Sequence, residues 1–141
     1  MKIILNKSCG GFEVSDEAYE LYAKKKGVSL YRYYDNYAKY VLNKTKIKGG
    51  AGFLTYYFTK DYGDNVRKRE IDWETYLYLN SKHRDDPILI EVIEELGRKA
   101  NGNYAGIKSK LVVVEIPDDL DYVIDDYDGF ETLHERKVIV W

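Results

Sequence analysis

The segment that most constrains the fold is a capped helix with one apolar side, beginning near residue 86. Asp86 suits the N-cap, because its carboxylate can accept from the free amides of a first turn, and Pro87 suits the first helical position. The apolar residues that follow at helical spacing are Ile88, Leu89, Val92, Ile93, Leu96 and Ala100. The pattern predicts a helix over about 87–100, ended by Asn101-Gly102. Because so wide a stripe must be buried against another layer, we expect a sheet beneath it.

A second helix is predicted over about 15–26. Ser15 suits its N-cap, Asp16 and Glu17 complement the helix dipole, and Gly27 ends it. The strands that we expect lie over 2–5, 30–34, 37–42, 53–60, 111–116, 122–127, 130–134 and 138–141. The sequence over 73–79 fits either a strand or a short helix. Because the order is mixed rather than a regular β-α-β alternation, we predict an α+β fold with a largely antiparallel sheet, and a single domain over 1–141.

Three details of the strands can be predicted. Asp35-Asn36 is expected to turn the chain between two strands, and Lys44 to Gly52 to form an exposed loop. Asp128-Gly129 between two strand-like runs is a strong signal for a hairpin. The continuous apolar run Leu111–Ile116 is typical of an interior strand, covered on both faces or nearly so.

The bulk properties exclude some classes of protein. The single cysteine allows no internal disulfide, which fits a reducing cytosol, and no apolar run approaches the roughly 20 residues that span a bilayer. We therefore expect a cytoplasmic protein with no membrane partner. The net charge of −2 combines 14 Lys/Arg against 8 Asp/Glu over 1–70 with 8 against 16 over 71–141. This asymmetry fits mutual neutralisation in the fold, a basic face opposite an acidic face, or head-to-tail association.

Tyrosine is the compositional outlier, with 15 of the 141 residues, and eight of these fall over 31–62. Tyrosine combines a flat apolar ring with a hydroxyl, which suits ligand and partner surfaces, but it also favours strands in general. Both interpretations remain open from the sequence. Clusters of Lys and Arg at 24–26 and 67–69 stand among the tyrosines, as in single-strand binding platforms. The overall acidity and the absence of a known RNA-binding signature argue against a nucleic-acid partner.

The loop Cys9-Gly10-Gly11-Phe12 lies between the first strand and the first helix. Glycines there would let backbone amides approach a phosphate or carboxylate, although the loop is neither a Walker nor a dinucleotide motif. The alternative is a tight turn with Phe12 in the core. Cys9 as a nucleophile would need His83 or His134 as its base. No spacing of Cys, His or acidic residues marks a metal site, so we predict neither metal nor cofactor.

Two blocks of the sequence resemble one family. The opening MKIILNKSCGGFEVS, and the later blocks RDDPILIEVIEELG, VEIPDD, YDGFE and HE, resemble a family of small, largely uncharacterised bacteriophage and prophage proteins. That family has an "MKIVINxCxGGFxLS" opening and an "RxDPxLIxVVEELG … VEIPDD … YDGxExxHE" second half. The tyrosine-rich middle, 28–81, has no counterpart and is the variable part.

The resemblance implies a phage context, and by analogy a role against host defence. Small phage proteins of one class sequester nucleotide-derived immune signals in pockets, often as homo-oligomers. We therefore expect a non-enzymatic protein in the host cytoplasm that binds such a signal. The expected ligand-binding residues are Asn6, Cys9, Gly10, Gly11, Phe12, Arg84, Asp85, Tyr127, Asp128, Glu131 and His134. One alternative is a protein-interaction module that inhibits a host protein. Another is a small nucleotide-processing hydrolase that uses Asp128, Glu131 and His134.

Overall fold

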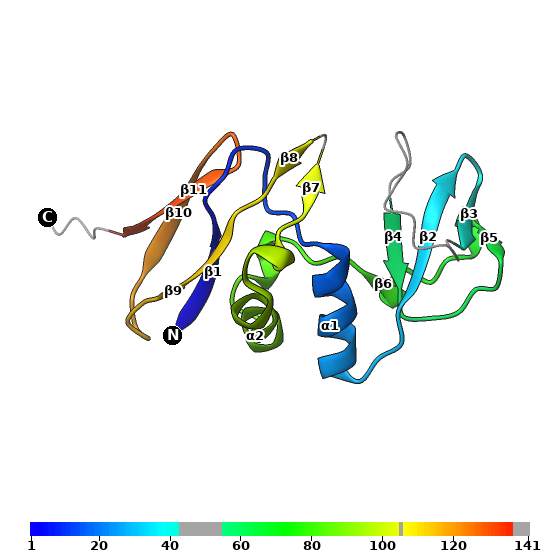
Figure 1. Ribbon diagram of the computed structural model, residues 1–141, viewed down its shortest axis with the longest axis horizontal. Coiled ribbons are helices and arrows are strands. Elements are labelled where there is room, and N and C mark those ends of the chain that lie inside the picture. Colours follow the sequence, from blue (N-terminus) through cyan, green and yellow to red (C-terminus); the bar gives the residue numbers. More distant parts are fainter. Residues whose placement is uncertain (43–54, 105, 137–141) are drawn as a thin grey trace, which may run out of the picture. The chain divides into compact units, whose positions relative to one another are not determined.

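The computed structural model describes residues 1–42, 55–104 and 106–136 (Figure 1). Among these residues there are two α-helices, and every strand pair is antiparallel, which confirms the predicted α+β class. The loop predicted over 44–52 and the strand predicted over 138–141 lie outside the described residues. Contacts cluster in two units. Unit 1 comprises Met1–Lys25 and the chain from Leu79 onward, and unit 2 comprises Lys26–Tyr78.

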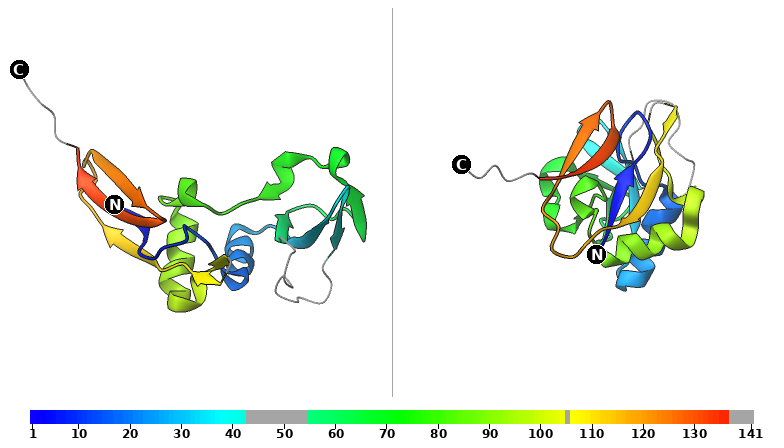
Figure 2. Two further views of the ribbon diagram at one scale, coloured as in Figure 1. Left: turned by 90° about the horizontal axis from the view of Figure 1, so that it is seen from above. Right: turned by 90° about the vertical axis from the view of Figure 1, so that its left-hand side faces the viewer.

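A two-stranded ribbon lies at the centre of unit 1. Strand β1 (Lys2–Asn6) pairs with β9 (Leu111–Glu115), with Ile3 opposite Val114. Successive side chains of a strand point to opposite faces, so Ile3 and Leu5 share one face, where they pack with the β10–β11 hairpin. Helix α2 contacts the ribbon as well, and Figure 2 shows the helix and the hairpin on opposite sides of it. The expected sheet beneath the helix is therefore this ribbon.

Helix α2 (Pro87–Leu96) begins as the sequence predicts. Asp86 Oδ1 accepts from the Ile88 amide at 2.9 Å, and Pro87 occupies the first helical position. The α-helix ends earlier than predicted, at Gly97, whose φ of 57° lies in the left-handed region where glycine is favoured. Helical turns continue to residue 100 as a 3-10 helix over Gly97–Ala100.

Helix α1 (Asp16–Lys26) confirms the predicted helix over 15–26. Ser15 Oγ accepts from the Ala18 amide at 3.2 Å, as an N-cap does. The helix packs beside α2 through the buried Tyr22, whose hydroxyl donates to Asp86 Oδ2 at 2.5 Å. Burial, followed by the hydrogen bond to the Asp86 carboxylate and its charge, raises the pKa of Tyr22.

The remaining strands of unit 1 form two hairpins. Strands β10 (Tyr122–Tyr127) and β11 (Phe130–Glu135) are joined by Asp128-Gly129, which confirms the predicted turn. Both turn residues have positive φ, 50° and 89°, as in a type I′ turn. Strands β7 (Asn103–Tyr104) and β8 (Ile107–Lys108) form the second hairpin. The prediction for 111–116 is wrong in one respect, because within the described residues β9 pairs with β1 alone and does not lie between two strands. The predicted cover on its faces is present, since α2 contacts β9 and the β10–β11 hairpin packs on Val112 and Val114.

Unit 2 is a five-stranded antiparallel sheet in the order β5-β3-β2-β4-β6. Its strands are β2 (Tyr31–Asn36), β3 (Lys39–Leu42), β4 (Thr55–Phe58), β5 (Asn65–Arg67) and β6 (Tyr76–Leu77). The predicted turn at 35–36 is wrong by two residues, because the chain turns at Tyr37-Ala38. Over 73–79, both alternatives occur, since a 3-10 turn at Trp73–Thr75 leads into β6.

The tyrosines form the core of unit 2. Tyr33, Tyr40 and Phe58 are buried together, and tilted or edge-to-face rings link them. Burial, the largest cause, raises the pKa of Tyr33 and Tyr40 and raises that of Tyr76 to about 12. Most of the tyrosine surplus is thus explained by packing. Unit 2 also matches the part of the sequence, 28–81, that the family resemblance does not cover.

The charge asymmetry of the sequence follows the two units. Lys26–Tyr78 has 10 Lys/Arg and 6 Asp/Glu, a balance of +4. The rest of the chain has 12 and 18, a balance of −6, and together these give −2. Within the described segments, none of the helices has the length and apolar character to cross a membrane.

Candidate functional site

The candidate residues surround the edge of β1 that faces away from β9. There, the Ile4 amide donates to the Arg84 carbonyl at 2.9 Å, and Arg84 Nη1 donates to the Ile4 carbonyl at 2.8 Å. Two residues along the strand, the Asn6 amide donates to Glu131 Oε1 at 2.8 Å. Backbone groups at a sheet edge need such partners when they are buried. Arg84 and Glu131 therefore take the place of a third strand.

Arg84 and Glu131 also bind each other. Nη2 lies 2.8 Å from Oε2 and Nη1 3.3 Å from Oε1, a two-point contact between side chains that are only 14% and 5% exposed. The guanidinium carbon of Arg84 lies 5.7 Å from the centre of the Phe12 ring. Glu131 thus neutralises the charge that was expected to hold a phosphate. This arrangement favours a structural role for Arg84, Glu131 and Phe12.

Asn6 joins three segments of unit 1. Its Nδ2 donates to the carbonyls of Ser8 at 2.8 Å and Gly129 at 2.7 Å, and its Oδ1 accepts from the Lys110 amide at 2.9 Å. The side chain is fully buried, so these bonds meet its needs inside the protein. Asn6 thus holds together the glycine loop, the hairpin turn and the start of β9. Its side-chain oxygen and nitrogen are bonded within the fold, which favours a structural role over ligand binding.

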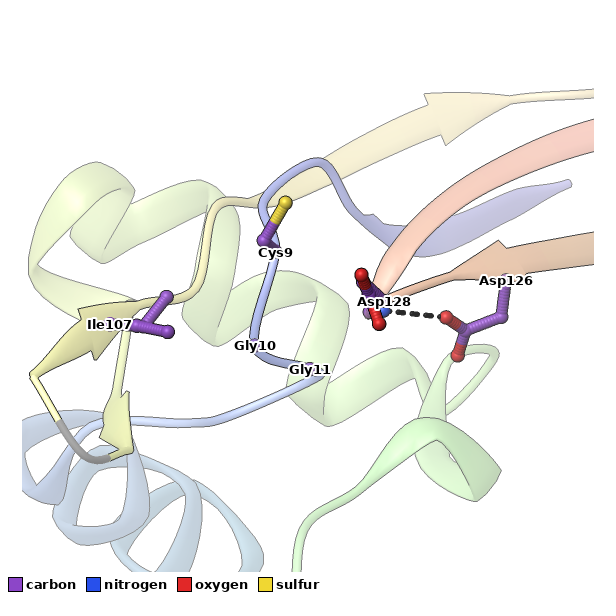
Figure 3. Close-up of a pocket in the computed structure, with 7 residues that line it drawn as sticks. Cys9, Gly10, Gly11, Ile107, Asp126 and Asp128 are labelled. Carbon is purple, nitrogen blue, oxygen red and sulfur yellow. Dashed lines mark hydrogen bonds between the residues drawn. The ribbon is translucent and has the colours of Figure 1, made fainter.

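The glycine loop lies directly against the hairpin turn (Figure 3). The Gly10 amide donates to the Asp128 carbonyl at 2.8 Å. A Cβ atom on Gly129 would lie 2.2 Å from the Gly11 nitrogen, so the two backbones meet too closely for any side chain at residue 129. The amide of Gly10, which could have bound an anion, is used within the fold.

The residues of this contact line an open hollow of about 530 Å³, and Figure 3 shows the lining residues. The residues that line it are Cys9, Gly10, Gly11, Ile107, Asp126, Asp128 and Gly129. The hollow has two carboxylates and no cationic side chain, which suits a cation better than a phosphate. Sequence reasoning missed Ile107, because the short β7–β8 hairpin gave no signal. Asp126 was not among the expected ligand-binding residues.

The remaining predicted residues lie elsewhere. Asp85 lines a second hollow, of about 450 Å³, with Lys2 and the first turns of α2. The ring of Tyr127 is exposed beside the hairpin turn. His134 Nε2 lies 2.9 Å from Asp125 Oδ2 on the outer face of the hairpin. The structure thus brings Cys9–Gly11 together with Asp128, and it leaves Asp85 and His134 outside that group.

The hydrolase alternative finds no geometric support. Glu131 and His134 are three residues apart on β11, so their side chains point to opposite faces. Glu131 is buried against β1, whereas His134 is exposed. The described residues also contain no group of three or more His, Cys, Asp or Glu that could hold a metal ion.

Comparisons of the chain with protein-family models, with curated proteins and with solved structures found no match. The functional argument therefore depends on the geometry of the chain itself.

Proposed function

We propose that this protein is a non-enzymatic protein-interaction module, and that its contact surface is the tip of the β10–β11 hairpin. The observation that carries the proposal is a pair of exposed aromatic residues on either side of the turn. Tyr127 is 81% exposed and Phe130, its direct partner across the two strands, is 39% exposed. Aromatic rings are typical anchors of protein interfaces, and these two lie beside a two-residue turn.

The surroundings of this tip indicate the chemistry of the partner. Ile107, which is also exposed, lines the adjacent hollow together with Asp126 and Asp128. The Lys7 ammonium lies 5.1 Å from the centre of the Phe130 ring, so aromatic rings, one cation and two carboxylates surround this tip. Such a surface complements a partner with an apolar patch and charged side chains of both signs at its rim. Following the phage resemblance, we propose that this partner is a bacterial host protein.

The same geometry argues against the expected nucleotide ligand. A sequestering pocket for phosphates needs cations or free amides that converge on an enclosed space. In unit 1, the Arg84 guanidinium is bound to Glu131, the Gly10 amide is bound to the Asp128 carbonyl, and the hollow is open. A protein partner requires none of these groups to be released.

Affinity capture from a bacterial lysate, followed by calorimetry with the purified partner, tests the proposal. Tyr127→Ala/Phe130→Ala should weaken binding about 30-fold or more, because loss of a central aromatic anchor costs about 2 kcal/mol or more. The matched control is Tyr37→Ala, which removes an exposed tyrosine from unit 2 and should leave this affinity unchanged. Equal affinity of the double variant and the wild type would refute the proposed surface.

A second measurement distinguishes the protein-interaction proposal from the hypothesis of nucleotide sequestration. Thermal unfolding in the presence of cyclic dinucleotides and ADP-ribose should show no change in Tm. A rise in Tm with any of these ligands would overturn the present proposal in favour of sequestration.

A further inference from the structure

One face of the sheet in unit 2 is basic. The register of β5, β3 and β2 places Arg67 opposite Lys39 and Lys39 opposite Asn36, and side chains alternate between faces along each strand. The face opposite the tyrosine core on these three strands therefore carries Asn65, Arg67, Lys39, Val41, Arg32, Tyr34 and Asn36. Figure 1 shows these strands side by side. This set has three cations and one aromatic ring, and it has no carboxylate.

Two of the cations are direct neighbours. Lys39 and Arg67 are paired across β3 and β5, and both are exposed. Like charges directly opposite each other destabilise a sheet. Lys68, by contrast, forms an ion pair with Asp35 at 2.7 Å, whereas among the described residues no carboxylate lies within ion-pair distance of Lys39 or Arg67. An anion bound between Lys39 and Arg67 would relieve their repulsion.

A strained aromatic residue lies in the turn that joins two of these strands, β2 and β3. Tyr37 has a φ of 58° in the turn between β2 and β3, a conformation that bulky residues rarely adopt and that hairpin turns usually give to glycine or asparagine. Its ring is 92% exposed, so packing does not account for its presence there. Strained backbone conformations cluster at functional sites, including ligand-binding sites. Tyr37 presents a free ring two residues from Lys39.

We propose that the β5–β3–β2 face, together with Tyr37, binds single-stranded nucleic acid. Lys39 and Arg67 would bind backbone phosphates, and a base would stack on the Tyr37 ring, as in sequence-tolerant single-strand binding. The positive balance of unit 2 supports the attraction. The proposed surface ends before β4, where Tyr57 on the same face is buried. This activity is independent of the protein interaction proposed for unit 1.

Fluorescence anisotropy with labelled single-stranded DNA and RNA of about ten nucleotides, a length within the usual site sizes, tests the proposal on the full chain. Each phosphate contact adds about 0.7 to the slope of log affinity against log salt. Lys39→Gln/Arg67→Gln should therefore reduce the slope by about 1.4. Between about 50 and 200 mM salt, the wild type should lose about 7-fold more affinity than this variant. Lys82→Gln/Lys108→Gln, which removes two exposed charges from unit 1, should keep the wild-type slope.

Tyr37→Gly separates binding from folding. Loss of one stacked base should weaken binding about 5- to 150-fold. The same change relieves the strained backbone, so the Tm should not fall. Tyr37→Phe, which keeps the ring, should retain most of the affinity.

Three results would overturn the proposal: no measurable binding of single strands by the wild type, an unchanged salt slope in the Lys39/Arg67 variant, or competition by polyglutamate as strong as that by single strands. The last result would indicate a general polyanion surface. Tyr127→Ala/Phe130→Ala should bind nucleic acid like the wild type, so a failure of either proposal can be told apart from a failure of the other.

Discussion

Removal of the Glu131 carboxylate should destabilise unit 1 more than any surface substitution. The carboxylate accepts from the Asn6 amide and from two nitrogens of Arg84, and its side chain is 5% exposed. Glu131→Ala leaves the buried Arg84 guanidinium without its carboxylate and the Asn6 amide without its acceptor at the edge of β1, which costs about 3–5 kcal/mol. Glu131→Gln keeps the shape and one acceptor oxygen, so the loss should be about 1.5–3 kcal/mol, the value of a charged hydrogen bond.

Urea unfolding of Glu131→Gln, Arg84→Ala and the double variant measures these values and the coupling between the two residues. We expect a coupling of about 1–3 kcal/mol, because residues within one hydrogen-bond network are not additive. Glu135→Gln, an exposed position on the same strand, is the control and should change stability by less than about 0.5 kcal/mol. The proposed role of Arg84 and Glu131 at the edge of β1 is refuted in two cases. Either Glu131→Gln lowers the free energy of unfolding no more than the control does, or the effects of the two single changes add up to that of the double variant.

Three further predictions concern other contacts. Gly129→Ala should lower the Tm and broaden the amide spectrum of the Cys9–Gly11 loop, because the new Cβ would meet the Gly11 nitrogen. Tyr22→Phe should cost about 1 kcal/mol in urea unfolding through the lost bond to Asp86, and a value near zero would contradict it. Folding raises the pKa of Tyr76 to about 12, so the neutral hydroxyl of Tyr76 stabilises the folded state. This contribution to the free energy of unfolding is complete below pH 10 and is lost as the pH rises from 10 to 12. Near-ultraviolet circular dichroism should show this loss, reduced in Tyr76→Phe.

Local signals predicted the elements that the structure confirms. Asp86-Pro87 marked the start of α2, and Asp128-Gly129 marked the hairpin, because capping and turn preferences act within a few residues. The turn at Tyr37-Ala38 was missed for the opposite reason, since a tyrosine at positive φ violates the local preference.

Long-range features could not be predicted from the pattern. Hydrophobicity reports how well the two faces of a strand are covered and says nothing of its edges. Residues 111–116 are packed on the hairpin through Val112 and Val114, yet β9 has only one partner within the described residues. Similarly, Arg84 and Glu131 are 47 residues apart, and their sequence contexts gave no sign that they would neutralise each other. The structure therefore brings the glycine loop beside Asp128, as the expected site required, and it binds Arg84 to Glu131, which the sequence did not indicate.

The connectivity of unit 1 has a consequence for how this chain can vary. The described strand pairs of unit 1 lie outside Lys26–Tyr78; they are β1–β9, β7–β8 and β10–β11. Unit 2 is therefore one continuous insertion in the sequence of unit 1. The return point is fixed by Leu79, which is buried and whose amide donates to the Tyr19 hydroxyl at 2.9 Å. A lineage could thus exchange the whole of unit 2 for another module, or shorten it to a loop, without altering a single strand register of unit 1.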